Sequence, residues 1–576
     1  MLKSNLSIIF STSLLGALMT SSLPTFAQQR PNMPKLVVQI TVDQLREDMI
    51  DRYSRGYTAN GFNYLLENGV VYTDARQRHA NTETVVGHTT LSTGTDPGIH
   101  GMVANNWRDN RTKLEPSTEG HESQSFDVNT SYHYATRDVK YPIIPIAGEV
   151  YAETDGRSAR DILVSTIGDE ILLSSGSAAK VFGISAKDRA AIGSTGHAGT
   201  AFWFDDKALS FVTSEFYLES YPDWHGEWVK KNMALSYQNT AWTLLLDPSN
   251  YIYADRDDMI WETDYPNWTR FFPHNFGTSD FSLFPGFIRT SPAMDVITLD
   301  FAKALIDGEN LGEDNITDYL AVSLNSVDYI GHAFGPSSLE AEDNLKQLDK
   351  QLDNFFAYLD AKIGLENVLI VLAADHGATE IPLFMNTVFR EDAGLFDFAN
   401  VEKRPSIVNL KSAHGITEQV SRYTHPFVYL DRQVLLEAGL DKADVTNLFA
   451  SEISKMAGVT STFTFEEIAT GSMPRSDIAL AVTRNFHPER AGDIYVILDP
   501  LWFVKDDSPA AGASQHGSPY AYDSHIPIMF AGPGIDHQVV SRRVEAIDVA
   551  PTIANYLSVK LPSGSIGKVL TEVLGQ

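Results

Sequence analysis

The sequence predicts an α/β fold built around a mostly parallel sheet. Three short runs rich in Val, Ile and Leu, at residues 36–40, 319–324 and 368–372, have the length of strands that are buried on both faces. An amphipathic helix lies between the last two, and the order strand, helix, strand forms a right-handed βαβ unit by default. A chain of 576 residues is long enough for a large α/β enzyme with insertions.

The ends and the apolar spacing of the intervening segment predict its helix. Pro336 and Ser337 open it, and Glu340 stands three residues after Ser337, as in a capping box. Leucines and phenylalanines over residues 345–359 then recur mostly at spacings of three and four. Two further strands and a late helix are expected at residues 493–498, 526–530 and 548–557.

Two stretches interrupt this pattern and are predicted to be insertions. Residues of about 200–290 are rich in Trp, Tyr, Phe, Asp and Asn and have few long periodic runs. Residues of about 385–490 mix short helices with polar segments. We therefore expect one catalytic domain, residues 28–576, that carries both insertions.

The N-terminal segment has the features of a secretory signal peptide, residues 1–27. Lys3 is followed by a mostly apolar run over residues 6–19, and Ala27 ends a small-residue cleavage pattern. The run is shorter than the roughly 20 residues that span a bilayer, although an uncleaved anchor is the alternative. We expect a periplasmic or extracellular protein without a stable membrane anchor.

Charge and cysteine content exclude several classes of function. Lys and Arg number 44 against 74 Asp and Glu, which gives a formal net charge of −30. Such acidity argues against a nucleic-acid partner or binding to an anionic membrane, both of which need a basic face. The absence of cysteine excludes disulfides, thiolate zinc sites and cysteine nucleophiles.

Acidic residues and histidines mark the carboxyl ends of the predicted strands, where open α/β sheets bind ligands. Each carboxylate alone could equally be a turn or helix-cap residue. Together they form an oxygen and imidazole donor set without sulfur, which suits zinc or another borderline divalent metal. The residues of this set are Asp43, Asp328, His332, Asp375, His376 and, more isolated, His516.

Thr84 is the candidate nucleophile. It precedes a helix-like stretch, where backbone N–H groups and the helix dipole favour an anion. A plain helix N-cap is the alternative role of such a threonine. Beside a metal, however, its hydroxyl can be held as an alkoxide that attacks phosphorus.

The order and spacing of these motifs resemble the alkaline phosphatase superfamily. Within it, the chain is similar to the phosphate-irrepressible bacterial alkaline phosphatases that use a threonine nucleophile, whose fold is like that of type I phosphodiesterases and nucleotide pyrophosphatases. The resemblance implies a three-layer sandwich around a mostly parallel central sheet, with inserted cap regions. The matching segments are residues 42–44, 84–89, 100–107, 185–189, 327–332, 375–377 and 516–520.

The resemblance also implies a two-zinc site, with Mn²⁺ or Co²⁺ as substitutes. Some members also need Ca²⁺, for which acidic loops such as residues 255–258 offer carboxylates. One zinc site would comprise Asp328, His332 and His516. The other would comprise Asp43, Asp375, His376 and the oxygen of Thr84.

Three further residues are implied to bind substrate. Lys187, Arg189 and Asn105 match residues that contact the non-bridging phosphate oxygens in the resembling monoesterases, although Asn106 is an alternative to Asn105. A Lys-x-Arg pair alone is most often a solvated surface feature, but related phosphodiesterases generally lack it. The implied function is that of a secreted zinc-dependent alkaline phosphatase, which hydrolyses small-molecule phosphate monoesters through a phosphothreonine. A phosphodiesterase or nucleotide pyrophosphatase is the alternative. A monomer is expected, although no sequence feature fixes the oligomeric state.

Overall fold

The structure is a computed structural model that describes residues 33–108, 132–146, 148–152, 155–505 and 512–575. The predicted signal peptide, residues 1–27, lies outside these ranges. Within them, no helix is both long enough and apolar enough to cross a membrane.

A ten-stranded sheet lies at the centre of the fold, and its strand order is β21-β2-β20-β13-β1-β12-β7-β8-β9, with β22 also paired to β2. Strands β20 and β9 run antiparallel to their neighbours, and the other strand pairs of this sheet are parallel. The strands are β1 (Leu36–Val42), β2 (Val70–Arg76), β7 (Val181–Ser185), β8 (Thr200–Asp205), β9 (Ser210–Val212), β12 (Asp318–Leu324), β13 (Val368–Ala373), β20 (His525–Ala531), β21 (Gln538–Val540) and β22 (Val544–Glu545). The predicted α/β class and mostly parallel sheet are therefore confirmed.

Strand β1 is the middle of the sheet and sets the position of the site. It pairs in parallel with β12 on one side and β13 on the other, so Thr41 lies opposite both Ser323 and Ala373. Every residue of these three strands is buried, as their continuous apolar runs predict. Because the three strands end at the same edge of the sheet, the segments that follow them are brought together.

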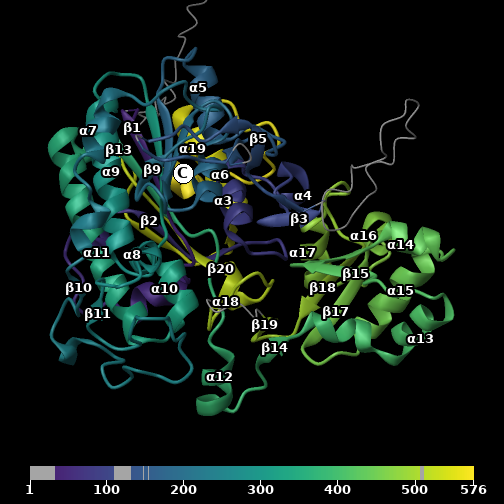
Figure 1. The fold of residues 1–576 in the computed structure, drawn as a ribbon. Helices are drawn as coiled ribbons and strands as arrows, with labels where there is room; N and C mark the ends of the chain where they lie inside the picture. Colours follow the sequence, from purple (N-terminus) through teal and green to yellow (C-terminus); the bar gives the residue numbers. More distant parts are fainter. Residues whose placement is uncertain (1–32, 109–131, 147, 153–154, 506–511, 576) are drawn as a thin grey trace, which may run out of the picture. The chain divides into compact units, whose positions relative to one another are not determined.

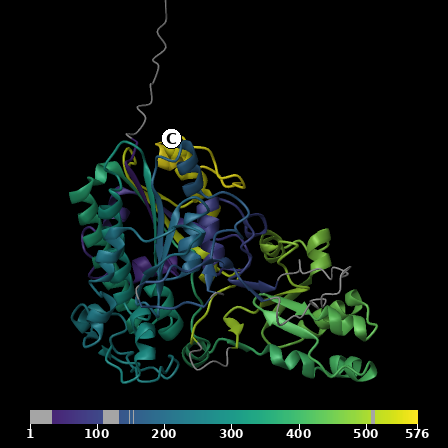
Figure 2. The ribbon, with the colours of Figure 1, turned by 45° about the horizontal axis from the view of Figure 1, so that its top comes forward.

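Helices cover both faces of the sheet (Figures 1 and 2). One face carries α7 (Asp223–Val229), α9 (Ala293–Glu309) and α11 (Leu339–Lys362). The other carries α3 (Thr84–Thr93), α5 (Ile167–Ser174), α6 (Asp188–Thr195) and α19 (Val549–Leu557). This arrangement is the three-layer sandwich that the resemblance implies.

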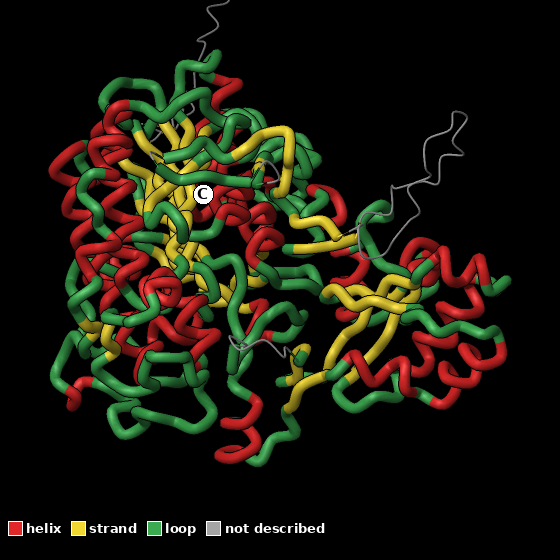
Figure 3. The backbone as a smooth tube through the Cα atoms, viewed as in Figure 1, coloured by secondary structure: helices red, strands yellow, loops and turns green. Residues whose placement is uncertain are grey.

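A smaller antiparallel sheet, with strand order β15-β16-β18-β17, occupies much of the predicted 385–490 insertion (Figure 3). The predicted strand at 493–498 belongs to this sheet and not to the central one. The strands of this sheet and the helices around them are α13 (Pro405–Ala413), β15 (Ser421–Thr424), β16 (Phe427–Leu430), α14 (Arg432–Glu437), α15 (Lys442–Ile453), β17 (Val459–Thr464), α16 (Phe465–Thr470), α17 (Asp477–Asn485) and β18 (Ile494–Leu498).

The aromatic-rich stretch of about 200–290 is divided between the central sheet and a segment of short elements outside that sheet. Its first part forms β8 and β9 of the central sheet. The remainder contains α7, short 3₁₀ turns, the two-residue strands β10 (Ala241–Trp242) and β11 (His274–Asn275), and α8 (Phe284–Arg289).

The predicted helix cap of α11 differs in detail. The helix begins at Leu339, and the N-cap is Ser338, whose hydroxyl accepts a hydrogen bond from the Ala341 N–H. Ser337 instead donates to Glu380, and the Glu340 carboxylate faces His274. The capping box of Ser337 and Glu340 is therefore absent, because tertiary partners take both side chains.

Candidate active site

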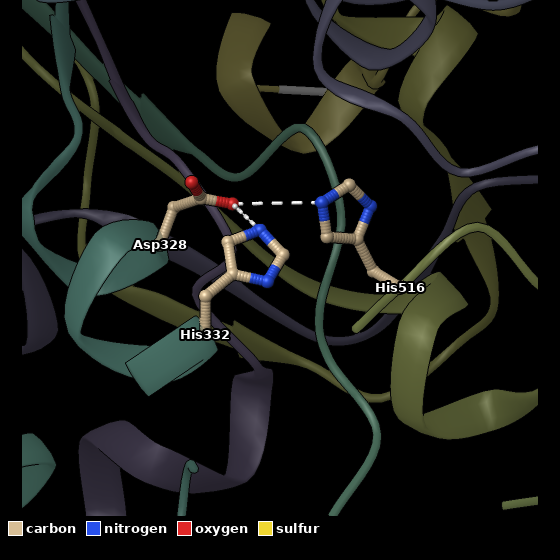
Figure 4. A group of neighbouring side chains, drawn as sticks. All are labelled: Asp328, His332 and His516. Atoms are coloured by element: carbon tan, nitrogen blue, oxygen red, sulfur yellow. Dashed lines mark ion pairs between the residues drawn. The ribbon is translucent and has the colours of Figure 1, made fainter. Parts of the chain in front are cut away.

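Asp328, His332 and His516 form the first of two compact groups (Figure 4). Asp328 and His332 lie one turn apart on α10 (Ser326–Phe334), which follows β12, and His516 comes from the loop before β20. The Nε2 atoms of His332 and His516 lie 3.3 Å and 3.5 Å from Asp328 Oδ1. Three donor atoms thus converge from segments far apart in the sequence.

Asp43, Asp375 and His376 form the second group, at the ends of β1 and β13. His376 Nε2 lies 3.4 Å from Asp43 Oδ1 and 3.3 Å from Asp375 Oδ2. All three side chains are fully buried. The six residues predicted as metal ligands are therefore brought together in the two sets that the resemblance implies.

The hydrogen bonds of the imidazoles fit metal coordination. The Nδ1 atoms of His332, His376 and His516 lie 2.8–2.9 Å from backbone carbonyl oxygens. A carbonyl can only accept, so Nδ1 carries the proton, and in a neutral ring this leaves Nε2 as the metal-binding atom. Two buried atoms of the second group, Asp43 Oδ1 and His376 Nε2, have no hydrogen-bond partner, and Asp375 Oδ2 lies 3.0 Å from His88 Nδ1. A divalent cation in this group would satisfy the unpartnered donor atoms.

Thr84 and Lys187 lie between the two groups. Thr84 is the first residue of α3 and is fully buried. Lys187 Nζ donates to Asp328 Oδ2 at 2.5 Å, pairs with Asp43 Oδ2 at 2.7 Å and lies 3.4 Å from Thr84 Oγ1. The ammonium group therefore links both groups to the candidate nucleophile.

Asn105, not Asn106, has its side chain beside the start of α3. Its Oδ1 accepts the Val85 N–H at 3.1 Å, while Asn106 pairs with Tyr134 in β3 (Asn106–Arg108). Arg189 lines the same cavity as Lys187, and its Nε has no hydrogen-bond partner. All the predicted substrate-binding residues thus lie around the two groups or on the cavity beside them.

Burial and charge set the protonation of the site. Burial, together with Asp328 and Asp375, raises the pKa of Asp43 to about 6. Burial also opposes the charge on Asp328, but Lys187 and His332 hold the pKa of that carboxyl well below its usual value. Burial lowers the pKa of His516 strongly, so its ring is neutral and able to bind a metal.

Two residues that orient the carboxylates were not predicted from the sequence. Asn325 Nδ2 donates to Asp43 Oδ2 at 2.8 Å. Gln44 donates through its side chain to Asp328 at 3.2 Å and through its backbone to Asp375 at 3.1 Å. In the sequence, Asn325 follows the end of a strand and Gln44 follows the proposed ligand Asp43, and these positions were the only indication of a role. Their hydrogen-bond partners are visible only in the folded chain. His88 Nδ1 also lies 3.0 Å from Asp375 Oδ2 and 2.9 Å from the Thr84 carbonyl oxygen.

Comparison with known proteins gives a consistent picture. The family described as type I phosphodiesterase / nucleotide pyrophosphatase matches residues 37–519. A relative from Elizabethkingia meningoseptica, named alkaline phosphatase PafA, is 33% identical over 577 residues, covering 99% of this chain and 98% of the relative. A relative from Myroides odoratus, named a calcium-transporting ATPase, is 32% identical over 559 residues, covering 96% of this chain and 97% of the relative.

A solved structure of wild-type alkaline phosphatase PafA has a TM-score of 0.84 to this fold at 34% identity. The match covers 94% of this chain and 99% of that one. The likeness thus extends over nearly all of both chains.

Proposed function

The chain belongs to the type I phosphodiesterase / nucleotide pyrophosphatase family, and on that premise we propose that it is an alkaline phosphatase that hydrolyses phosphate monoesters. One observation carries the proposal: Lys187 pairs with one carboxylate of each of the two groups of metal-type donors and lies beside Thr84. We infer that each group binds zinc, with Mn²⁺ or Co²⁺ as substitutes.

In the proposed reaction Thr84 is the nucleophile. Thr84 Oγ1 releases its proton to solvent and bonds to phosphorus as the bond from phosphorus to the ester oxygen breaks, and the alcohol leaves with a proton from solvent. Water then hydrolyses the phosphothreonine, which releases phosphate and restores the hydroxyl. When bound, the two metal ions would supply positive charge that stabilises the attacking and leaving oxygens.

The cationic side chains favour a monoester over a diester. A monoester carries one more negative charge, and the Lys187 ammonium lies 3.4 Å from Thr84 Oγ1, where the phosphate must approach. Arg189 can bind two phosphate oxygens at once. We assign these two residues, with Asn105, to the non-bridging phosphate oxygens.

A paired assay tests the assignment. The double variant Lys187→Ala/Arg189→Ala should lower kcat/KM for p-nitrophenyl phosphate by about 10²-fold or more, and that for bis-p-nitrophenyl phosphate far less. The control is Lys230→Ala/Lys231→Ala, which removes two exposed lysines beyond α7. Equal losses on both substrates would contradict the monoester assignment, and a wild-type preference for the diester would favour the phosphodiesterase alternative.

We also infer the organisation and location of the protein. We place one catalytic domain at residues 28–576, with insertions at about 200–290 and 385–490. The smaller sheet supports the second insertion, because it has a hydrophobic core of its own around Val428, Phe449 and Ile494. We propose export through the signal peptide, residues 1–27. The mass of the mature protein would show whether these residues have been removed. We also propose a monomer, which sedimentation would test, and bound Ca²⁺, which elemental analysis would test.

A further inference from the structure

Two cavities lie next to each other near the phosphate-binding residues. The first, of about 270 Å³, is lined by Lys187 and Arg189 among others. The second, of about 350 Å³, is lined by residues of α8 and of the segment before it. The two share three lining residues: Asp206, Arg289 and Tyr329. The second cavity therefore adjoins the one in which Lys187 and Arg189 lie.

Tyr329 forms the common wall. It follows Asp328 on α10, and its ring centroid lies 5.1 Å from Lys187 Nζ and 5.5 Å from Arg289 Cζ. Arg289 is held in turn by Asp206, at 3.0 Å. Two cations thus lie against the ring of Tyr329, which lines both the phosphate-binding cavity and the second cavity.

Four of the residues that line the second cavity are aromatic. Besides Tyr329 they include Tyr265, Trp268 and Phe287, and the last two rings are stacked at 5.0 Å with an interplanar angle of 13°. All three come from the aromatic-rich stretch to which the proposed reaction gives no role. Rings lining a pocket of this size suit a flat apolar group, which they can contact face-on or edge-on.

We propose that this second cavity binds the ester group of the substrate and favours phosphate monoesters whose ester group is an aromatic ring. The inference rests on the proposed monoesterase function. With the phosphate bound beside Thr84 and Lys187, an in-line ester group extends away from the nucleophile, and Tyr329 is the aromatic residue that lines both cavities.

Gly286 offers a way to fill the cavity without disturbing its walls. It lies in α8 and lines the cavity, and a Cβ added there would have no heavy atom within 4 Å. Gly286→Leu should therefore occupy space that the ring would need. The matched control is Gly226→Leu in α7. A Cβ added there is equally unobstructed, and Gly226 lines neither of the two cavities.

The test compares kcat/KM for phenyl phosphate and ethyl phosphate in the metal-loaded enzyme. Gly286→Leu should lower the phenyl-to-ethyl ratio about tenfold, and Gly226→Leu should leave it unchanged. A ratio that stays constant in Gly286→Leu overturns the proposal. If the wild-type enzyme hydrolyses neither ester, the monoesterase function fails and this inference fails with it, so the two failures are distinguishable.

A second variant tests whether the subsite selects aromatic rings. Tyr265 is half-buried, and Tyr265→Leu keeps an apolar wall while removing one ring. It should lower turnover of phenyl phosphate more than that of cyclohexyl phosphate. Equal losses would overturn the aromatic preference and show a site for any apolar group of that size.

Discussion

Glu262 and Glu340 provide a test of how burial couples protonation to stability. Glu262 is 6% exposed and Glu340 is fully buried. Burial and the neighbouring Glu340 charge raise the pKa of Glu262 to about 9, although Arg270 opposes this, and burial also raises the pKa of Glu340 well above its usual value. Three further groups face the pair: Asp257, Asp343 and His274. Burial lowers the pKa of His274 to about 4, so its ring is neutral. The pair is therefore expected to be protonated at neutral pH.

The sign of the effect follows from the direction of the shift. In the unfolded chain Glu262 titrates near 4.5, so between that pH and about 9 the folded state holds a proton that the unfolded state has lost. The contribution of this proton to the free energy of unfolding is therefore fully present below the pKa of the unfolded state. It is lost as the pH rises towards the pKa of the folded state. Each pH unit in this window costs about 1.4 kcal/mol for one proton, so a rise from pH 6 to pH 8 costs about 3 kcal/mol as an order of magnitude.

Glu262→Gln should remove this dependence, because a neutral amide of similar shape carries no titrating proton. Urea unfolding of the wild type and the variant at pH 6, 7 and 8 gives the two slopes, with Glu67→Gln at an exposed position of α2 (Phe62–Asn68) as control. The variant should gain stability relative to the wild type as the pH rises. Parallel curves, or a wild type that gains on the variant, would refute the reasoning.

Three further predictions concern the nucleophile, the core and the packing of the site. Thr84→Ala should abolish turnover of p-nitrophenyl phosphate, yet keep most of the metal content measured by elemental analysis, because the six carboxylate and imidazole ligands remain and only the Thr84 oxygen is lost. Phe301→Ala should lower the free energy of unfolding by about 3–5 kcal/mol in urea titrations, since this fully buried ring packs against Phe202, Phe211 and Trp228. Gly87→Ala should lower the amount of bound metal at limiting zinc, because the added Cβ would lie 2.2 Å from the Asp375 carbonyl oxygen. Unchanged zinc affinity would show that the backbone at Asp375 can shift without disturbing the site.

The central strands could be predicted from the sequence because their signal is local. Residues 36–42, 318–324 and 368–373 are mostly apolar, and burial on both faces explains that pattern without knowledge of partners. The strand at 494–498 has the same composition, yet it joins another sheet, because strand pairing is decided by contacts distant in sequence. The same limit applies to Ser337 and Glu340, whose tertiary partners override a local capping signal.

The candidate site shows the same division. The six donor residues could be named because their order and spacing resemble a family, and strand ends explain why three of them converge. Asn325 could not be predicted, since its role depends on an Asp43 carboxylate 282 positions away. Residues that orient ligands have no fixed spacing relative to them, so local pattern carries little information about their partners.

The Gly-His pairs at 87–88 and 331–332 indicate what fixes the site before any metal binds. A Cβ at Gly331 would lie 1.9 Å from Gln44 Oε1, and one at Gly87 would lie 2.2 Å from the Asp375 carbonyl oxygen. Each glycine thus lets one segment of the site touch the segment that carries another ligand or its hydrogen-bond donor. Because the donor groups are held by these contacts, a metal ion would not have to order the loops on binding, and less of its binding free energy would be lost to conformational entropy. The glycines are therefore as much a part of the candidate metal centre as the carboxylates that they bring into contact.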